Sequence, residues 1–148
     1  TINNSFKIFD ISRNEDKENI TISATHNAYL KKFGYLHKRT IKFCKKDSNI
    51  AGSDYLLKKN QNEVEVDFSI RFHIYPGINA TQTMSRKSIL LQIDKKRSWI
   101  FFCNNEGAQV EKSLFLGSNK ILNNQCIVIY GSTKNQNANI EWELKKSS

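Results

Sequence analysis

Apolar and polar residues alternate along several short segments of the chain. Residues 20–25 (ITISAT) and 40–45 (TIKFCK) each place every second side chain on one face. The alternation is longest in residues 64–75 (VEVDFSIRFHIY), and it stops at Pro76 and Gly77. A period of two is typical of strands with one buried and one solvated face, and a proline followed by a glycine is typical of a turn. The three segments therefore predict strands, of which residues 64–75 form the clearest.

Further short apolar segments follow, and turn-forming residues separate them. The strand candidates are residues 88–93, 99–103, 112–116, 126–130 and 139–144, and the turn candidates are residues 94–97, 104–107, 117–120 and 131–134. No stretch of ten residues carries a convincing 3.6-residue apolar period. Many short strands punctuated in this way predict an all-β fold, an antiparallel two-sheet β-sandwich with few or no helices. We expect residues 1–148 to form this sandwich as a single domain.

The composition is that of a folded domain, but it does not decide whether the positive charge serves to bind an acidic partner. The chain has 148 residues, of which 39% are hydrophobic and nine are Phe, enough for a buried core. Its net charge of +9 points to an acidic partner, although a Lys-, Asn- and Ile-rich composition can also reflect the codon bias of a genome. Neither an apolar run of about 18 residues nor a signal-peptide pattern is present, so we expect no membrane partner.

Cysteine and histidine spacing argues against a disulfide framework and against a metal site. Cys44, Cys103 and Cys126 are odd in number and widely spaced, so we expect buried free thiols. The three histidines form no HxH or HExxH pattern. The chain also lacks the GxSxG, Walker-type and GxGxxG motifs. We therefore expect no metal and no cofactor, and the common hydrolase, NTPase and dinucleotide classes are excluded.

The densest group of chemically active side chains lies between residues 23 and 39. If a strand opens near Tyr35, then Tyr35, His37 and Arg39 share one face with Ile41 and Phe43. Such a face is polar at the strand end and apolar toward its middle, which suits a site at the rim of a core. The alternative is that His37 and Arg39 only bridge neighbouring strands by hydrogen bonds.

A second polar face accompanies the longest alternating segment. Arg71 and His73 share a face with Ser69 and Tyr75, while the opposite side is apolar and predicts core. A guanidinium pairs with carboxylate or sulfate through two hydrogen bonds, so this face is a candidate for anion recognition. A buried or interdomain hydrogen-bonding role is the alternative.

Several different short motifs follow one another in a characteristic order along most of the chain. They are His26-x-x-Tyr29, Gly34-x-x-His37-x-Arg39, Arg71-Phe72-His73-x-x-Pro76, Trp99, Ser113-x-x-x-Gly117, Gln125-x-x-Val128-x-x-Gly131 and Trp142. Their order and spacing resemble the C-terminal half of heparinase II/III-like polysaccharide lyases of bacteria. The candidate substrate-contact residues are accordingly His26, Tyr29, Tyr35, His37, Arg39, Arg71 and His73.

The resemblance implies a larger enzyme that binds an acidic polysaccharide, such as a glycosaminoglycan, between an upstream α/α toroid of helices and this C-terminal sandwich. It implies cleavage by β-elimination and a location in the cell envelope or periplasm. The catalytic Tyr and Asn or His of the family belong mainly to the helical domain. The catalytic His and metal ligands of the sandwich are expected upstream of the residues present here. No catalytic role is therefore transferred to His26, the catalytic residues stay unknown, and this chain alone is expected to be inactive.

Two other functions remain open. A non-catalytic sandwich that binds carbohydrate or protein would use exposed aromatic side chains. The candidates are Tyr29, Tyr35, Tyr55, Trp99 and Trp142, although we expect at least one of the two tryptophans in the core. The net positive charge also suggests nucleic-acid binding as a function. The lysine pairs are scattered over several turns, which argues against this function.

Overall fold

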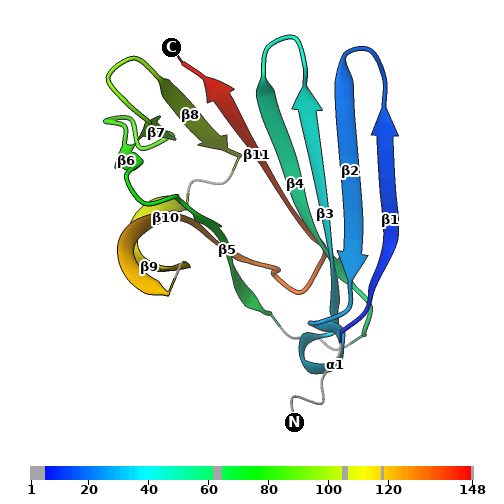
Figure 1. Cartoon of the computed structure of the whole chain (residues 1–148). Helices are drawn as coiled ribbons and strands as arrows, with labels where there is room; N and C mark the ends of the chain where they lie inside the picture. The colour runs from blue at the N-terminus through cyan, green and yellow to red at the C-terminus, as the bar shows by residue number, and fades with distance from the viewer. Residues whose placement is uncertain (1–5, 62–64, 105–106, 118, 148) are drawn as a thin grey trace. The chain divides into compact units, whose positions relative to one another are not determined.

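The structure is a computed structural model, and it describes residues 6–61, 65–104, 107–117 and 119–147. These residues form eleven strands and one short helix (Figure 1). The elements are β1 (Ile8–Glu15), β2 (Asn19–His26), α1 (Leu30–Phe33), β3 (Tyr35–Cys44), β4 (Asn49–Lys58), β5 (Asp67–His73), β6 (Asn79–Gln82), β7 (Ser88–Gln92), β8 (Ser98–Cys103), β9 (Ala108–Gly117), β10 (Lys120–Ser132) and β11 (Ala138–Lys146). They make two antiparallel sheets of eight and three strands. The predicted all-β, two-sheet fold is confirmed.

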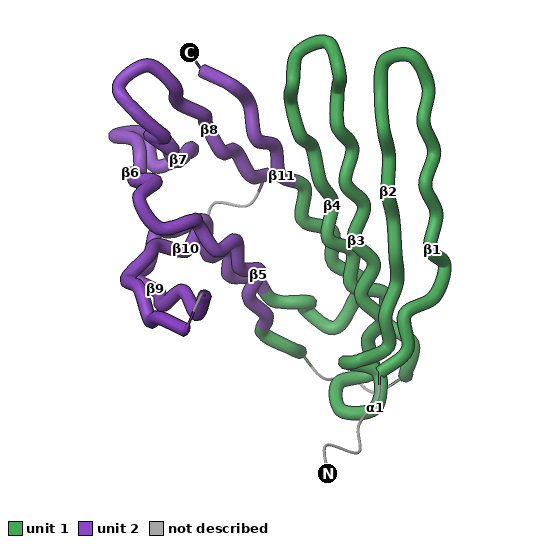
Figure 2. Tube along the Cα trace, in the orientation of Figure 1, with its two compact units in different colours: residues 1–67, 132–141 green, residues 68–131, 142–148 purple. Residues whose placement is uncertain are grey.

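The chain divides into two compact units, which Figure 2 colours separately. The first comprises Thr1–Asp67 and Ser132–Glu141, and the second comprises Phe68–Gly131 and Trp142–Ser148. Strand β11 contributes to both. That residues 1–148 act as a single domain stays a prediction. Within the described residues, no helix has the length and apolarity needed to cross a membrane.

The first unit is built on a four-stranded antiparallel meander, β1-β2-β3-β4. Helix α1 connects β2 to β3 at one end of this meander (Figure 1). Gly34 ends the helix at a φ of 80°, a left-handed conformation that glycine adopts readily. The first part of β11 follows β4 in the sheet, where the Ser53 hydroxyl donates to Asn139 Oδ1 at 2.7 Å.

The second unit packs two sheets against each other. One contains β6, β7, β8 and the end of β11, and the other has the order β5-β10-β9. Phe72 of β5 lies 5.1 Å from Phe101 of β8 and 4.8 Å from Trp142 of β11, measured between ring centroids. The rings of Phe101 and Trp142 are stacked at 6.2 Å. Since Phe72 comes from the three-stranded sheet and the other two rings from the larger one, this cluster forms the core of a sandwich.

The alternating segments correspond to strands, with one correction of length. Residues 20–25 lie in β2 and residues 40–44 in β3, as predicted. The prediction for residues 64–75 was too long: β5 spans only Asp67–His73, and residues 62–64 lie outside the described part. At both of its ends side chains add to the backbone pairing. Thr133 Oγ1 accepts from the Val66 amide and Asn124 Nδ2 donates to the Ile74 carbonyl, while the Thr133 amide donates to the Val66 carbonyl and the Ile74 amide to the Gln125 carbonyl.

The five later strand candidates lie in β7 to β11. Strands β1, β4 and β6 were not predicted. Strand β1 was missed because a bulge between Phe9 and Ser12 breaks its alternation, and β6 because it has only four residues. In β4 the segment IAGSD places Gly52 and a carboxylate in mid-strand, against strand propensity. Residues 131–134 were expected as a turn, but β10 continues to Ser132.

Predicted burial of cysteine and tryptophan is confirmed in part. Cys126 is buried, whereas Cys44 and Cys103 are partly exposed, so the expectation of three buried thiols was wrong for two of them. Trp142 is 8% exposed and belongs to the core, as expected for at least one tryptophan.

Replacing Phe101 should show how much the aromatic cluster stabilises the second unit. Phe101 is 3% exposed, and its neighbour Phe102 on the other face of β8 is 40% exposed. We expect Phe101→Ala to lower the free energy of unfolding by about 3–5 kcal/mol. Urea unfolding followed by circular dichroism measures this, with Phe102→Ala as the matched control. Equal losses in the two variants would contradict the assignment of Phe101 to the core.

Candidate functional site

Three side chains of the first unit form a continuous hydrogen-bonded chain across neighbouring strands. In the antiparallel register His26 of β2 pairs with His37 of β3, and Arg39 of β3 pairs with Asp54 of β4. His26 Nε2 lies 2.8 Å from His37 Nδ1, and His37 Nε2 lies 2.7 Å from Asp54 Oδ1. His26 is partly exposed and Asp54 only 2% exposed. We call His26, His37 and Asp54 the relay, because they connect the surface to a buried carboxylate.

The neighbours of the relay determine where its protons lie. The Ala28 amide donates to His26 Nδ1 at 3.2 Å, so a neutral His26 carries its proton on Nε2. That N–H donates to His37 Nδ1, which leaves the proton of a neutral His37 on Nε2, facing Asp54. Each imidazole therefore donates toward the carboxylate.

Arg39 holds the inner end of the relay. Its Nε donates to the same Asp54 Oδ1 at 2.7 Å. The Asp54 side chain is 1% exposed and that of Arg39 is 37% exposed. A buried carboxylate is costly unless charged or polar groups pair with it. Two donors on one oxygen therefore stabilise Asp54 as an anion and fix the orientation of the His37 ring.

Exposed aromatic side chains surround the outer end of the relay. The Tyr29 ring lies 5.2 Å from the His26 ring in an edge-on arrangement, and the Phe6 ring lies 5.8 Å from it. Phe33 lies 6.5 Å from Tyr29, and Lys32 Nζ lies 5.1 Å from the centroid of the Phe33 ring. Phe6, Tyr29 and Phe33 are 57%, 45% and 38% exposed. We call these three side chains the aromatic collar.

The pKa of His26 lies below its ordinary value of 6.5. Burial is the main cause, because it disfavours the charged imidazolium, and the nearby His37 and Arg39 act in the same direction. At neutral pH the imidazole is therefore uncharged.

Most residues of the relay and its surroundings were predicted from the sequence, and Asp54 was not. His26, Tyr29, His37 and Arg39 lie together in the first unit, and His37 and Arg39 share one face of β3 as predicted. Tyr35 is 2% exposed, so the structure places it in the core of this unit and not at the surface. Asp54 was missed because β4 was not anticipated.

Arg71 and His73 belong to the second unit. Arg71 forms an ion pair with Glu111 at 3.4 Å, and Glu111 also accepts from the Tyr130 hydroxyl at 2.5 Å. His73 Nδ1 lies 3.4 Å from the Ser113 hydroxyl. All of these contacts are exposed and lie within the second unit, and anion recognition by this face stays a prediction. Among the described residues, no group of three or more His, Cys, Asp or Glu side chains is placed to hold a metal ion.

Comparisons with known proteins agree with the motif order. The family model described as heparinase II/III-like, C-terminal, matches residues 3–143. Comparison with curated proteins finds no match. The solved structures similar to this chain include the heparan sulfate lyase HepC from Pedobacter heparinus, with a TM-score of 0.79, 12% identity, 95% of this chain covered and 22% of that chain.

Two further solved structures are similar to this chain. The heparinase III that is the BT4657 gene product gives a TM-score of 0.71 at 11% identity, covering 91% of this chain and 20% of its own. Another heparinase III gives a TM-score of 0.68 at 10% identity, covering 96% of this chain and 21% of its own. At such low identity the likeness shows the fold. The chain spans about a fifth of the length of these proteins.

Removing the charge of Asp54 should destabilise the first unit. We expect Asp54→Asn to lower the free energy of unfolding by about 3 kcal/mol, because Arg39 then lacks its buried counter-charge. Asp47→Asn is the matched control, since Asp47 is exposed on the turn after β3. Urea unfolding at neutral pH measures both. Two equally stable variants would show that the Asp54 charge is not needed.

Acidification should destabilise the chain through His26. Its folded-state pKa is below 6.5, so the unfolded state binds the proton more readily, and stability falls as the pH drops below about 6.5. Carboxylates of lowered pKa, such as Asp16 and Asp94, lose their contribution at lower pH, below about 4. Urea unfolding at pH 7.5 and 5.5 should therefore show a loss that is smaller in His26→Gln. An identical loss in both proteins would rule out His26 as its source.

Proposed function

Because the chain belongs to the heparinase II/III-like C-terminal family, we propose that it is the sandwich part of a lyase that cleaves acidic, uronate-containing polysaccharide by β-elimination. In this proposal the aromatic collar and His26 form one wall of the substrate site. The observation that carries it is the neutral, partly exposed imidazole of His26, which lies among exposed aromatic rings at the outer end of the relay.

The chemistry of an acidic sugar matches the collar and its surroundings. Aromatic side chains offer flat apolar faces to the ring of a sugar and a polar handle where they carry a hydroxyl, as Tyr29 does. The exposed Lys31 and Lys32 of α1 add positive charge beside the collar, and the chain as a whole carries +9. Cationic surfaces attract carboxylate and sulfate groups. A polyanionic glycan therefore fits this end of the unit better than a neutral one.

His26 would contact the substrate through the edge and face of its ring, because His37 and the Ala28 amide already engage both of its nitrogens. β-Elimination needs a base that removes the proton next to the uronate carboxylate, a group that neutralises this carboxylate, and an acid that protonates the leaving oxygen. We propose that His26 and Tyr29 contact and orient the sugar, while the proton-transferring residues belong to the upstream helical domain. The 148-residue chain alone would then bind acidic glycan without cleaving it.

A non-catalytic carbohydrate-binding sandwich is the second candidate, and the exposed collar favours it as well. The two candidates differ in what the protein does when upstream sequence is present. A lyase releases unsaturated uronate products, whereas a binding module retains the glycan unchanged. Location in the cell envelope or periplasm of a bacterium is part of the lyase proposal. The scattered lysines argue against a nucleic-acid partner.

The test is a set of variants in the protein extended upstream. His26→Ala and Tyr29→Ala should each lower kcat/KM on an acidic polysaccharide by about ten-fold or more, a loss of about 1.4 kcal/mol in transition-state stabilisation. Formation of unsaturated uronate, followed by its ultraviolet absorbance, measures the rate on heparin-like and alginate-like polymers. Tyr75→Ala is the control, because Tyr75 is 67% exposed in the second unit.

One outcome would decide against the lyase, and another would decide only against the proposed site. Absence of product on every uronate polymer tried, together with retained glycan binding that Tyr29→Ala abolishes, would favour the binding module. Full activity in both His26→Ala and Tyr29→Ala would remove the collar from the substrate site and leave the reaction class untouched.

A further inference from the structure

Five basic side chains of the second unit lie at one end of its larger sheet. They are Lys95, Lys96 and Arg97 of the turn between β7 and β8, and Lys145 and Lys146 at the end of β11. Lys146 pairs with Trp99 of β8, and the Ser147 amide donates to the Ser98 carbonyl at 2.9 Å. The end of β11 therefore lies beside the residues that follow the turn (Figure 1). We call these five basic side chains the cationic end.

Asp94 holds the turn of the cationic end in a defined conformation. Its Oδ1 accepts from the amides of Lys96 and Arg97 at 2.9 and 2.8 Å, and Arg97 Nε donates to its Oδ2 at 2.6 Å. The hydrogen bond from the Arg97 side chain, followed by the one from the Lys96 amide, lowers the pKa of Asp94. The carboxylate thus binds the backbone of its own turn, and the side chains of Lys95 and Lys96 stay exposed.

The carboxylates of this end are paired with two of its five cations. Asp94 forms an ion pair with Arg97 at 2.6 Å, and Glu143 forms one with Lys145 at 3.0 Å. None of the ion pairs among the described residues includes Lys95, Lys96 or Lys146. Three exposed ammonium groups therefore produce a positive potential that no neighbouring carboxylate cancels.

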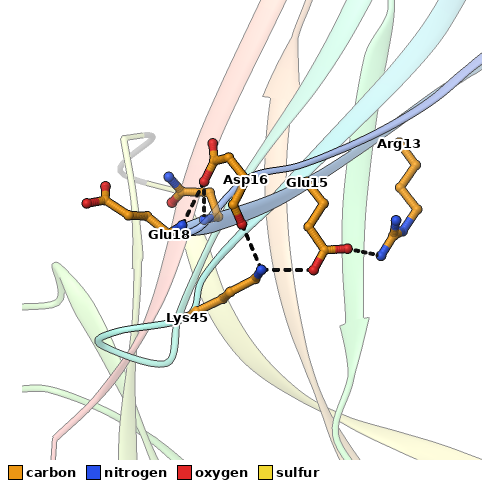
Figure 3. A network of polar contacts seen from close by, with 6 residues as sticks. Arg13, Glu15, Asp16, Glu18 and Lys45 are labelled. Carbon is orange, nitrogen blue, oxygen red and sulfur yellow. Dashed lines mark hydrogen bonds and ion pairs between the residues drawn. The ribbon is translucent and has the colours of Figure 1, made fainter.

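Basic side chains near a turn of the first unit are arranged differently. Arg13 and Lys45 both bind Glu15, at 2.5 and 2.8 Å (Figure 3). Amide hydrogen bonds lower the pKa of Asp16 most, and the charges of Lys45 and Lys42 act in the same direction. Carboxylates thus accompany the cations there, and the positive charge of the chain is unevenly distributed.

We propose that the cationic end is a second binding site for acidic polysaccharide, in which Lys95, Lys96 and Lys146 bind carboxylate or sulfate groups. The inference rests on the proposed function for the chemical class of this ligand. The site shares no residue with the relay or the aromatic collar, and it belongs to the other unit. Each ammonium group offers a compact positive charge and three hydrogen-bond donors, which suit such oxyanions.

The surroundings of the three lysines favour a glycan over nucleic acid. Single-stranded nucleic acid is bound by aromatic side chains, on which its bases stack, as well as by cations. The exposed ring beside the cationic end is Phe102, and Lys145 Nζ lies 6.0 Å from its centroid. Because a cation already engages this ring, the cationic end binds through charge and hydrogen bonds, which an acidic sugar can satisfy without stacking.

Lysine acetylation of the 148-residue chain tests the proposal. A short heparin fragment serves as the probe, and the modification rate of each lysine is followed by mass spectrometry. With the fragment at about ten times its Kd, we expect acetylation of Lys95, Lys96 and Lys146 to slow by about ten-fold. Since salt screens exposed charges, this protection should weaken as the salt concentration rises.

The matched controls are three exposed lysines of the first unit that have carboxylates as neighbours in sequence or space. They are Lys17, Lys42 and Lys46, and their rates should not change. Two triple variants remove equal charge, one replacing Lys95, Lys96 and Lys146 with Gln and the other replacing the three control lysines with Gln. On immobilised heparin the first variant should elute at lower salt than the second.

Three results would overturn the proposal. Unchanged acetylation rates at Lys95, Lys96 and Lys146 would mean that the cationic end binds no glycan. Equal protection of the control lysines, or equal elution of the two triple variants, would mean that heparin responds to net charge alone. Stronger protection of the cationic end by a DNA duplex than by heparin at the same charge concentration would identify nucleic acid as its partner.

Lyase activity and the collar variant separate this inference from the proposed function. Tyr29→Ala should leave the protection of Lys95, Lys96 and Lys146 unchanged, because Tyr29 belongs to the first unit. Protection of the cationic end without activity of the upstream-extended protein on any uronate polymer overturns the lyase and supports this site. Activity without protection overturns this site and leaves the lyase.

Discussion

The buried carboxylate of Asp54 is the constraint on which the candidate site depends. A charge that is 2% exposed has to be paired, and His37 and Arg39 both donate to its Oδ1. This pairing fixes the ring of His37, whose Nδ1 must then accept a hydrogen bond, and His26 supplies it. One buried charge thus sets the tautomers of two imidazoles and presents the outer one among the exposed rings of the collar.

The same face of the meander combines this polar chain with apolar side chains. A strand with period two brings His37 and Arg39 to the side that carries Ile41 and Phe43, so both groups of side chains follow from one register.

Alternation in the sequence was enough to predict the all-β class, β2, β3 and the shared face of His37 and Arg39. It was not enough for β4, where Gly52 and the charged Asp54 occupy mid-strand positions that propensity disfavours. Asp54 is favourable there because of its partners His37 and Arg39, which lie 17 and 15 residues away and are not part of a local pattern. Tyr35 lies on the predicted face but is 2% exposed, because burial depends on tertiary packing, about which local alternation carries no information.

Long-range proton–nitrogen NMR of the imidazole rings tests the central claim most directly, because it reports which nitrogen of each histidine carries the proton. The account predicts that both His26 and His37 hold their protons on Nε2 at pH 7.5, and that Asp54→Asn changes the nitrogen shifts of both rings. A proton on Nδ1 of either ring, or shifts of His26 that ignore Asp54→Asn, would contradict it.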